Sequence, residues 1–328
     1  MINYQLYPLK FEPICLEKIW GGNRLKTLLG KKYNTKNCGE SWEISGVEGN
    51  ISVVANGFLK GNDLSELIEI YMGDLVGDKI YEQFGIEFPL LIKFIDAQDD
   101  LSIQVHPNDE LSKERHNAFG KTEMWYVVDV ADGALINSGF NQPVDRKKYL
   151  EYLENGNLTD LLKYDEIKVG DVFFIPAGRV HAIGKGTMVA EIQQTSDVTY
   201  RIFDYNRKDD KGNLRELHTD LALDAIDFTY LDDYKTKYTA ELNKPTEIVS
   251  CRYFTTNILE FDKSIEKDYN NLDSFVIYIT LEGNFAIETE EGTEQMAKGE
   301  TILIPASIEF LKLNPQNEKV KLLEVYIQ

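Results

Sequence analysis

The order of a few polar residues along the chain constrains its fold most. These residues are histidines and their polar neighbours, and they lie in or next to short strand-like runs. Only four histidines occur in 328 residues. Gln104 and His106 close one strand-like run, and Glu123 lies in a second. His181 follows a third run, which a Gly-Asp pair precedes and a Pro-Ala-Gly turn ends. This order is typical of a small β-barrel that gathers metal ligands at its mouth.

These four polar residues form a candidate metal site. Side chains two positions apart on a strand point to the same face, so Gln104 and His106 project together. Two imidazoles, one carboxylate and one amide oxygen favour zinc first, and then Fe(II), Mn or Co. Taken alone, His106 could be a hydrogen-bonded core residue and His181 a loop residue. The combination of all four residues carries the prediction.

Several stretches of the chain resemble the type I mannose-6-phosphate isomerases, and most closely the short bacterial branch of that family. The strong matches are Leu101–Asp109, Gly120–Val127, Phe173–Ile183 and Ala190–Asn206, and weaker ones are Lys18–Gly22 and Gly39–Gly46. The resemblance extends over most of residues 1–230. It implies a cupin-type barrel with one Zn²⁺ ion, in an enzyme that interconverts mannose 6-phosphate and fructose 6-phosphate through an enediol.

A repeated string predicts a second barrel. Val169–Ala177 resembles Lys298–Ala306, because each has a glycine, an acidic residue, a strand-like run and a Pro-Ala pair. At the same spacing His181 corresponds to Phe310, and the second repeat contains no histidine. The second barrel is therefore expected to bind no metal.

The predicted fold is mainly β, with two cupin-type jelly-roll barrels and helical segments inserted in and around the first. We expect residues 1–240 to form the metal-binding catalytic domain and residues 241–328 a metal-free domain. Helical patterns are present at Asp63–Tyr71, at Asp145–Leu162 with a break near Asn155, and at Leu214–Ile226. Strands are expected at Pro89–Ala97, Tyr253–Phe261, Ser274–Leu281, Asn284–Thr289, Glu300–Ile304 and Val320–Ile327, and a charged linker at Tyr230–Lys244.

The charge balance narrows the choice of partners. The chain has 55 acidic and 35 basic residues, which gives a net charge of −20. Binding to nucleic acid by phosphate neutralisation is therefore not expected, and a sugar phosphate needs local Lys and Arg residues to overcome the global field. No run of 18 apolar residues and no export signal is evident, so no membrane partner and a cytoplasmic location are expected.

The three cysteines give no motif. Cys15, Cys38 and Cys251 are odd in number and widely spaced, and no Cys-X-X-Cys pattern occurs. Neither a disulfide framework nor a thiolate zinc site is indicated, and we expect reduced thiols.

The resemblance assigns Lys121, Glu191 and Arg201 to catalysis. Lys121 shares a strand face with Glu123, and a lysine beside a dication is shifted towards its neutral form, which suits proton transfer. Arg201 cannot act as a base, so we expect it to stabilise the enediolate or to orient the substrate. Glu191 is either the base for the carbon proton or a residue that holds Lys121 and Arg201 in place.

For the substrate, the resemblance points to Ser102 and Lys93 at the phosphate and to Trp20 at the pocket rim. Ser102 falls on the same strand face as Gln104 by the two-residue period. The alternatives are a strand-edge serine, a lysine that reaches the surface along its aliphatic stem, and a tryptophan of the plain core.

Two other functions fit part of the pattern. An Fe(II) cupin oxygenase would use His106, Glu123 and His181 as a facial triad. A non-catalytic sugar-binding cupin would have little use for both Lys121 and Arg201 beside a metal. The remaining histidines, at positions 116 and 218, are expected to be solvated or capping residues.

Overall fold

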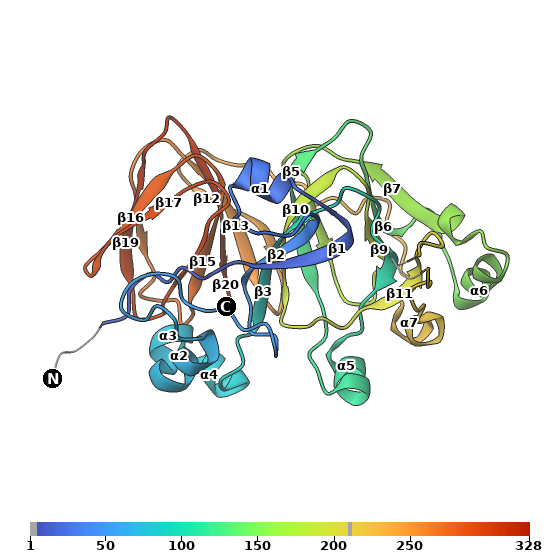
Figure 1. The fold of residues 1–328 in the computed structure, drawn as a ribbon, viewed down its shortest axis with the longest axis horizontal. Coiled ribbons are helices and arrows are strands. Elements are labelled where there is room, and N and C mark those ends of the chain that lie inside the picture. Colours follow the sequence, from blue (N-terminus) through green and yellow to red (C-terminus); the bar gives the residue numbers. More distant parts are fainter. Residues whose placement is uncertain (1–4, 209–211) are drawn as a thin grey trace.

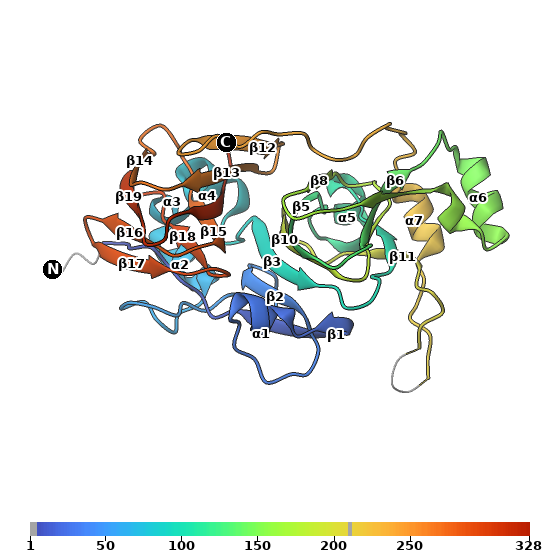
Figure 2. The same ribbon diagram turned by 90° about the horizontal axis from the view of Figure 1, so that it is seen from above.

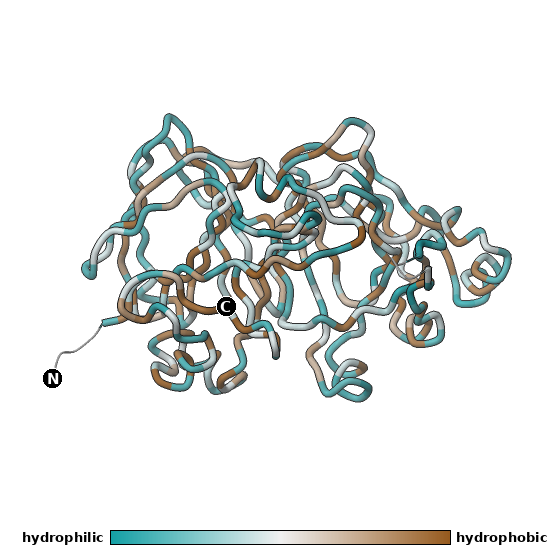
Figure 3. The backbone as a smooth tube through the Cα atoms, viewed as in Figure 1, coloured by the Kyte–Doolittle hydropathy of each residue, from teal (hydrophilic) through white to brown (hydrophobic). Residues whose placement is uncertain are grey.

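The structure, a computed structural model, describes residues 5–208 and 212–328, which form two β-sandwich units side by side (Figure 1). The predicted mainly β fold with two jelly-roll units is confirmed. Apolar stretches follow the central strands of both units, whereas the outer loops and the helical segment Asp109–His116 are mostly hydrophilic (Figure 3).

The first unit consists of two facing sheets. The six-stranded sheet has the order β1 (Ile14–Gly22), β2 (Cys38–Ile44), β3 (Leu90–Asp96), β10 (Thr187–Gln194), β5 (Glu123–Val130) and β8 (Val172–Ile175). The five-stranded sheet has the order β11 (Tyr200–Phe203), β4 (Ile103–Val105), β9 (His181–Ile183), β6 (Leu135–Phe140) and β7 (Leu162–Glu166). Every residue of β3 and β10 is buried, as expected for central strands covered on both faces.

The second unit repeats this plan with fewer strands. Its five-stranded sheet has the order β12 (Pro245–Ser250), β13 (Thr255–Phe261), β20 (Val320–Tyr326), β15 (Val276–Glu282) and β18 (Thr301–Ile304). Its four-stranded sheet has the order β14 (Ile265–Asp268), β19 (Phe310–Pro315), β16 (Phe285–Thr289) and β17 (Gly292–Met296). The five predicted strands of this region are all present, and β12, β14, β17 and β19 are additional.

The helices lie around the sheets. They are α1 (Arg24–Leu29), α2 (Leu64–Tyr71), α3 (Gly73–Val76), α4 (Asp78–Phe84), α5 (Asp109–His116), α6 (Arg146–Glu154), α7 (Thr219–Ala225) and the 3-10 helix η1 (Leu158–Leu161). The predicted start of α2 is confirmed, because Asp63 and Glu66 form a reciprocal capping box. The predicted helix Asp145–Leu162 is present as α6 and η1, with a break after Asn155.

The predicted helix Leu214–Ile226 is too long at its N-terminal end. Only Thr219–Ala225 is helical, and Leu214 instead forms a β-bridge with Lys208. Leu214 and Leu217 fit helical spacing, but both are exposed. They therefore form no buried apolar face that would stabilise a helix before Thr219. From α7 the chain crosses to β12 along one side of the molecule (Figure 2), and the predicted linker Tyr230–Lys244 contains no helix or strand.

Each unit has the same arrangement of four neighbouring strands in its larger sheet. The order β3-β10-β5-β8 in the first unit corresponds to β13-β20-β15-β18 in the second. The glycine of the repeated string has a positive φ in both copies, 92° at Gly170 and 85° at Gly299. Each glycine donates its backbone N–H to the strand that pairs with the following run, at Val127 O and Thr280 O. The repeat seen in the sequence is therefore a repeat of structure.

The expected correspondence of His181 with Phe310 is wrong by one residue. Phe310 is 55% exposed and lies on the outer face of β19, whereas Leu311 is buried among the interior residues of the second unit. Gln104 pairs with His181 in the first unit, and Lys267 pairs with Leu311 in the second. Since a shift of one residue reverses the face of a strand, Leu311 is the counterpart of His181.

The N-terminal part of the chain packs against the second unit. Leu9 and Leu303 exchange backbone hydrogen bonds of 2.8 and 2.9 Å. α3 continues this contact, because the carbonyls of Leu75 and Val76 accept hydrogen bonds from Ala306 and Phe275. The boundary expected between residues 240 and 241 stays a prediction, and these contacts join the two sides of it.

The expectation of reduced thiols is wrong for two of the three cysteines. Cys15 and Cys38 form a disulfide with a Cα–Cα distance of 5.8 Å, because β1 pairs antiparallel with β2 and brings them together. Cys251 is free and partly buried, and burial raises the pKa of its thiol. Within the described residues, no helix is both long enough and apolar enough to span a membrane.

Candidate active site

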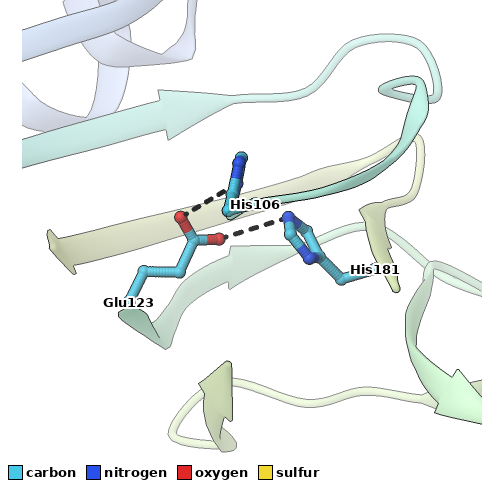
Figure 4. Close-up of side chains that lie close together, drawn as sticks. All are labelled: His106, Glu123 and His181. Carbon is cyan, nitrogen blue, oxygen red and sulfur yellow. Dashed lines mark ion pairs between the residues drawn. The ribbon is translucent and has the colours of Figure 1, made fainter. Parts of the chain in front are cut away.

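Three of the four predicted metal ligands lie together in the interior of the first unit (Figure 4). Glu123 begins β5, His181 begins β9 on the facing sheet, and His106 directly follows β4. The Nε2 atoms of His106 and His181 each lie 3.4 Å from one carboxylate oxygen of Glu123, Oε2 and Oε1 respectively. All three side chains are buried, so the site is shielded from bulk water.

The orientation of both imidazoles suits metal binding through Nε2. Nδ1 of His106 lies 3.0 Å from the carbonyl of Val198, and Nδ1 of His181 lies 2.8 Å from the carbonyl of Arg179. A carbonyl can only accept, so each Nδ1 carries the proton and each Nε2 carries the lone pair. Burial lowers the pKa of His106 to about 3 and also lowers that of His181, which keeps both rings neutral.

The residues present fit a metal ion of the zinc class. Nε2 of both histidines and both oxygens of Glu123 are buried without a hydrogen-bond partner. Buried polar atoms are normally paired, so four convergent unpaired acceptors point to a cation. Nitrogen and oxygen ligands bound at about 2.0–2.2 Å to a tetrahedral ion lie about 3.4 Å apart, as each Nε2 and its nearer Glu123 oxygen do.

Gln104 is placed next to this triad by the strand register. It pairs with His181 on β9 and with Arg201 on β11. Directly opposite residues of antiparallel strands project to the same face, so Gln104, His181 and Arg201 share one face of the five-stranded sheet. The role of Gln104 as a fourth ligand stays a prediction.

Lys121 lies beside the triad, although it precedes β5 instead of lying within it. Its Nζ is 3.5 Å from Oε2 of Glu123, and the side chain is buried. Burial alone would raise the pKa of Glu123, but this pKa lies well below its usual range, and the charge of Lys121 is the largest influence that lowers it. Glu123 is therefore ionised, as a metal ligand must be.

Arg201 is held by the segment that precedes α7. Its Nη1 donates to the carbonyl of Glu216 at 2.8 Å, while its Nε is buried without a partner. Its backbone N–H donates to Nδ1 of His218 at 3.1 Å. His116 contacts the Tyr200 hydroxyl at 2.8 Å. The two remaining histidines thus support neighbouring residues and lie outside the triad.

Glu191 and Lys93 form a buried ion pair in the six-stranded sheet. They are directly opposite on β10 and β3, with Nζ 3.0 Å from Oε1. Burial raises the pKa of Glu191, and Glu123 adds to this shift, while Lys93 and Lys121 oppose it. The carboxylate is thus electrostatically linked to the triad.

Two tryptophans complete this arrangement, and no local pattern in the sequence indicates their role. Trp42, Lys93, Glu191 and Trp125 are directly opposite one another on β2, β3, β10 and β5, and we call them the cross-strand row. Trp125 donates its indole N–H to Oε2 of Glu191 at 2.7 Å, and Trp42 donates to Oε2 of Glu40 at 2.7 Å. The Glu40 carboxylate also lies 3.7 Å from Lys93.

The remaining predicted substrate residues are buried. Ser102 directly precedes β4 and is 5% exposed. Trp20 lies at the end of β1 and belongs to an apolar cluster with Leu101 and Trp125. This packing agrees with the core interpretation of Trp20, and its role at the pocket rim stays a prediction.

Comparison with known proteins identifies the family. The model of the phosphomannose isomerase type I catalytic domain matches residues 9–129, and the mannose-6-phosphate isomerase cupin domain matches residues 244–322. The chain is 36% identical to mannose-6-phosphate isomerase ManA of Bacillus subtilis, over 93% of this chain and 95% of that protein. The chain belongs to the type I mannose-6-phosphate isomerases. It is accordingly an aldose–ketose isomerase.

Solved structures of this family have the same fold. The mannose 6-phosphate isomerase from Bacillus subtilis superposes with a TM-score of 0.88 at 32% identity, covering 98% of this chain and all of that one. A mannose 6-phosphate isomerase bound with zinc and yttrium superposes with a TM-score of 0.78 at 16% identity, over 98% of this chain. At that identity the second similarity shows the fold alone.

Proposed function

We propose that this chain is a zinc-dependent isomerase that interconverts mannose 6-phosphate and fructose 6-phosphate by proton transfer between C1 and C2. The observation that carries this proposal is the convergence of four buried, unpaired acceptor atoms on His106, Glu123 and His181, with Lys121 beside them. The family of the chain supplies the substrate.

The metal would be held by His106, Glu123 and His181, with Gln104 as a fourth ligand. When bound, Zn²⁺ supplies Lewis-acid polarisation of the sugar oxygens. The presence of zinc in a solved mannose 6-phosphate isomerase of the same fold supports this choice. The donor set of two nitrogens and oxygens agrees with it.

The proton transfer is the task of the residues around the triad. Glu191 or Lys121 removes the proton from C2 of the open-chain aldose, the C–H electrons form the C1=C2 bond, and the C1=O π electrons move to O1, which gains a proton to give the enediol. O2 then loses its proton, the C2=O bond forms, and the C1=C2 electrons take the returned proton at C1 to give the ketose. Burial raises the pKa of Glu191, which makes this carboxylate a stronger base than an exposed one. Arg201, which stays charged, stabilises the enediolate or orients the substrate.

The phosphate contacts are proposed at Ser102 and Lys93. Lys93 already has ion-pair partners in Glu40 and Glu191, so a phosphate at this position would share the lysine with them. The rim position of Trp20, the cytoplasmic location and the domain boundaries are proposed on the sequence alone.

The test measures fructose 6-phosphate formed from mannose 6-phosphate by the purified protein, together with its metal content. We expect turnover that is lost on chelation and restored by zinc. Turnover that is unchanged after complete removal of the metal would overturn the zinc-dependent mechanism. Absence of turnover by the zinc-loaded protein would overturn the proposal that mannose 6-phosphate is the substrate.

A further inference from the structure

We propose that Trp125 is a positioning residue for Glu191, and that its indole N–H fixes the direction in which this carboxylate faces the substrate. The inference rests on the catalytic role proposed for Glu191. It adds to the active site a residue whose contribution depends on one hydrogen bond.

The two oxygens of Glu191 are held from opposite sides. Trp125 on β5 donates to Oε2 at 2.7 Å, and Lys93 on β3 lies 3.0 Å from Oε1. Both partners are directly opposite Glu191 in the sheet, so the carboxylate is held between two neighbouring strands. The hydrogen bond at Oε2 and the charge of Lys93 near Oε1 together restrict rotation of the carboxylate about its last bond.

Trp125 is itself fixed, and it contacts the metal centre. The residue is fully buried, and its ring meets the ring of His181 edge-on, with centroids 5.3 Å apart at an interplanar angle of 73°. Trp125 also follows Glu123 by two residues on β5, so both side chains project to the same face. One indole therefore sets the position of Glu191 relative to two metal ligands.

Glu40 and Glu191 both approach Lys93, at 3.7 and 3.0 Å, and each receives an indole N–H from its own side of the cross-strand row. Without the Trp125 donor, Oε2 of Glu191 would be a buried acceptor with no partner. Such an atom is unfavourable, and the side chain would turn towards another donor such as Lys93.

The test replaces Trp125 by Phe, which keeps a buried aromatic ring and removes only the indole donor and part of the volume. Loss of a hydrogen bond that orients a metal-site group typically costs about 10- to 100-fold in activity. We expect kcat to fall by this factor, with KM within about twofold of wild type and the zinc content unchanged. Phe173→Leu is the control, because Phe173 is directly opposite Trp125 in the same apolar cluster and donates no hydrogen bond.

The control isolates the hydrogen bond from the packing. We expect kcat of Phe173→Leu to stay within about threefold of wild type. An equal fall in both variants would assign the effect to packing and overturn the inference. A kcat near the wild-type value in Trp125→Phe, with zinc bound, would overturn it as well.

A spectroscopic measurement covers the case in which Trp125→Phe does not fold. The chain has three tryptophans, so its indole ¹⁵N–¹H spectrum is simple to assign. We expect Glu191→Gln to shift the Trp125 indole signal, and an unshifted signal would overturn the contact. If Glu191→Gln keeps full turnover, the proposed role of Glu191 is wrong; if it loses turnover while Trp125→Phe does not, only the present inference is wrong.

Discussion

Glu191 of the first unit and Glu324 of the second occupy the same place in the two sheets. Glu191 lies between Lys93 and Trp125 on the neighbouring strands, and Glu324 lies between Asn257 and Tyr278. Both carboxylates are buried. Both copies thus have a carboxylate in the interior, although only the first has the candidate metal-binding triad among the described residues.

The second unit holds its carboxylate with a lysine. Lys267 Nζ lies 2.5 Å from Oε1 of Glu324, and both side chains are largely buried. Because removal of one partner leaves a buried charge, we expect Lys267→Met to lower the free energy of unfolding by about 3–5 kcal/mol, measured by urea denaturation. The double variant Lys267→Met/Glu324→Leu should recover much of this loss. The control is Lys319, which is more exposed and forms an ion pair with Glu260. Its replacement by Met should lower the free energy of unfolding by at most about 1 kcal/mol.

The metal prediction concerns the triad. We expect His106→Ala and His181→Ala to lose bound zinc, because each removes one of the convergent nitrogen ligands. Elemental analysis of the purified variants measures this. His116→Ala is the matched control and should keep the metal, since His116 contacts Tyr200 outside the triad. Full occupancy in both triad variants would contradict the assignment.

The second unit is expected to bind no metal. Val276 occupies the position of Glu123, and Leu311 that of His181, so two ligands are replaced by aliphatic side chains. Titration of the metal-free protein with zinc should reach saturation at one ion per chain. An anomalous scattering peak within residues 245–328 would show that the prediction is wrong.

Lys121 and Arg201 are expected to serve the reaction instead of metal binding. Lys121→Met and Arg201→Ala should keep zinc and the fold and lose turnover of mannose 6-phosphate. If both residues act mainly in the transition state, kcat falls together with kcat/KM; a ground-state clamp at Arg201 would instead raise KM alone. Near-normal kinetics of both variants with zinc retained would remove these residues from the mechanism.

Acid should weaken the contribution of Glu40. Burial alone would raise its pKa, but Lys93 and Lys18 outweigh burial and lower it from 4.5 to about 2. The unfolded chain then binds more protons than the folded one between these values, so the stabilisation is present above about pH 4.5 and is lost towards pH 2.

A shift of this size corresponds to about 3 kcal/mol at neutral pH. We expect Glu40→Gln to lose about this amount at pH 7 in urea denaturation, with a difference from wild type that shrinks as the pH falls below 4.5. Glu82→Gln, which changes an exposed carboxylate, serves as the control and should show little difference at any pH.

The parts of the site that the sequence predicted depend on local patterns. His106, Glu123 and His181 each close or open a strand-like run, and turn residues mark those ends. The start of α2 could also be predicted from the sequence, because its capping box lies within four consecutive residues. Such signals need no knowledge of which strands pair.

The parts that the sequence did not predict depend on pairing and register. Trp125 meets Glu191 only because β5 pairs with β10, and the disulfide of Cys15 and Cys38 exists only because β1 pairs with β2. Phe310 was assigned to the wrong face of its strand, because one extra residue in the connection moves every following side chain to the opposite face. None of these relations has a local signature in the chain.

The backbone pairing of Leu9 with Leu303 has a consequence for how the protein is made. A ribosome makes Leu9 long before Leu303, so this pairing has to wait for β18, whereas the neighbouring Phe11 can already bridge Val54. The same delay applies to α3, whose carbonyls bond to residues 275 and 306. We therefore expect nascent chains that stop before β15 to lack the contacts of Leu9 and α3 with the second unit, and these contacts to form only once β15 and β18 have been made.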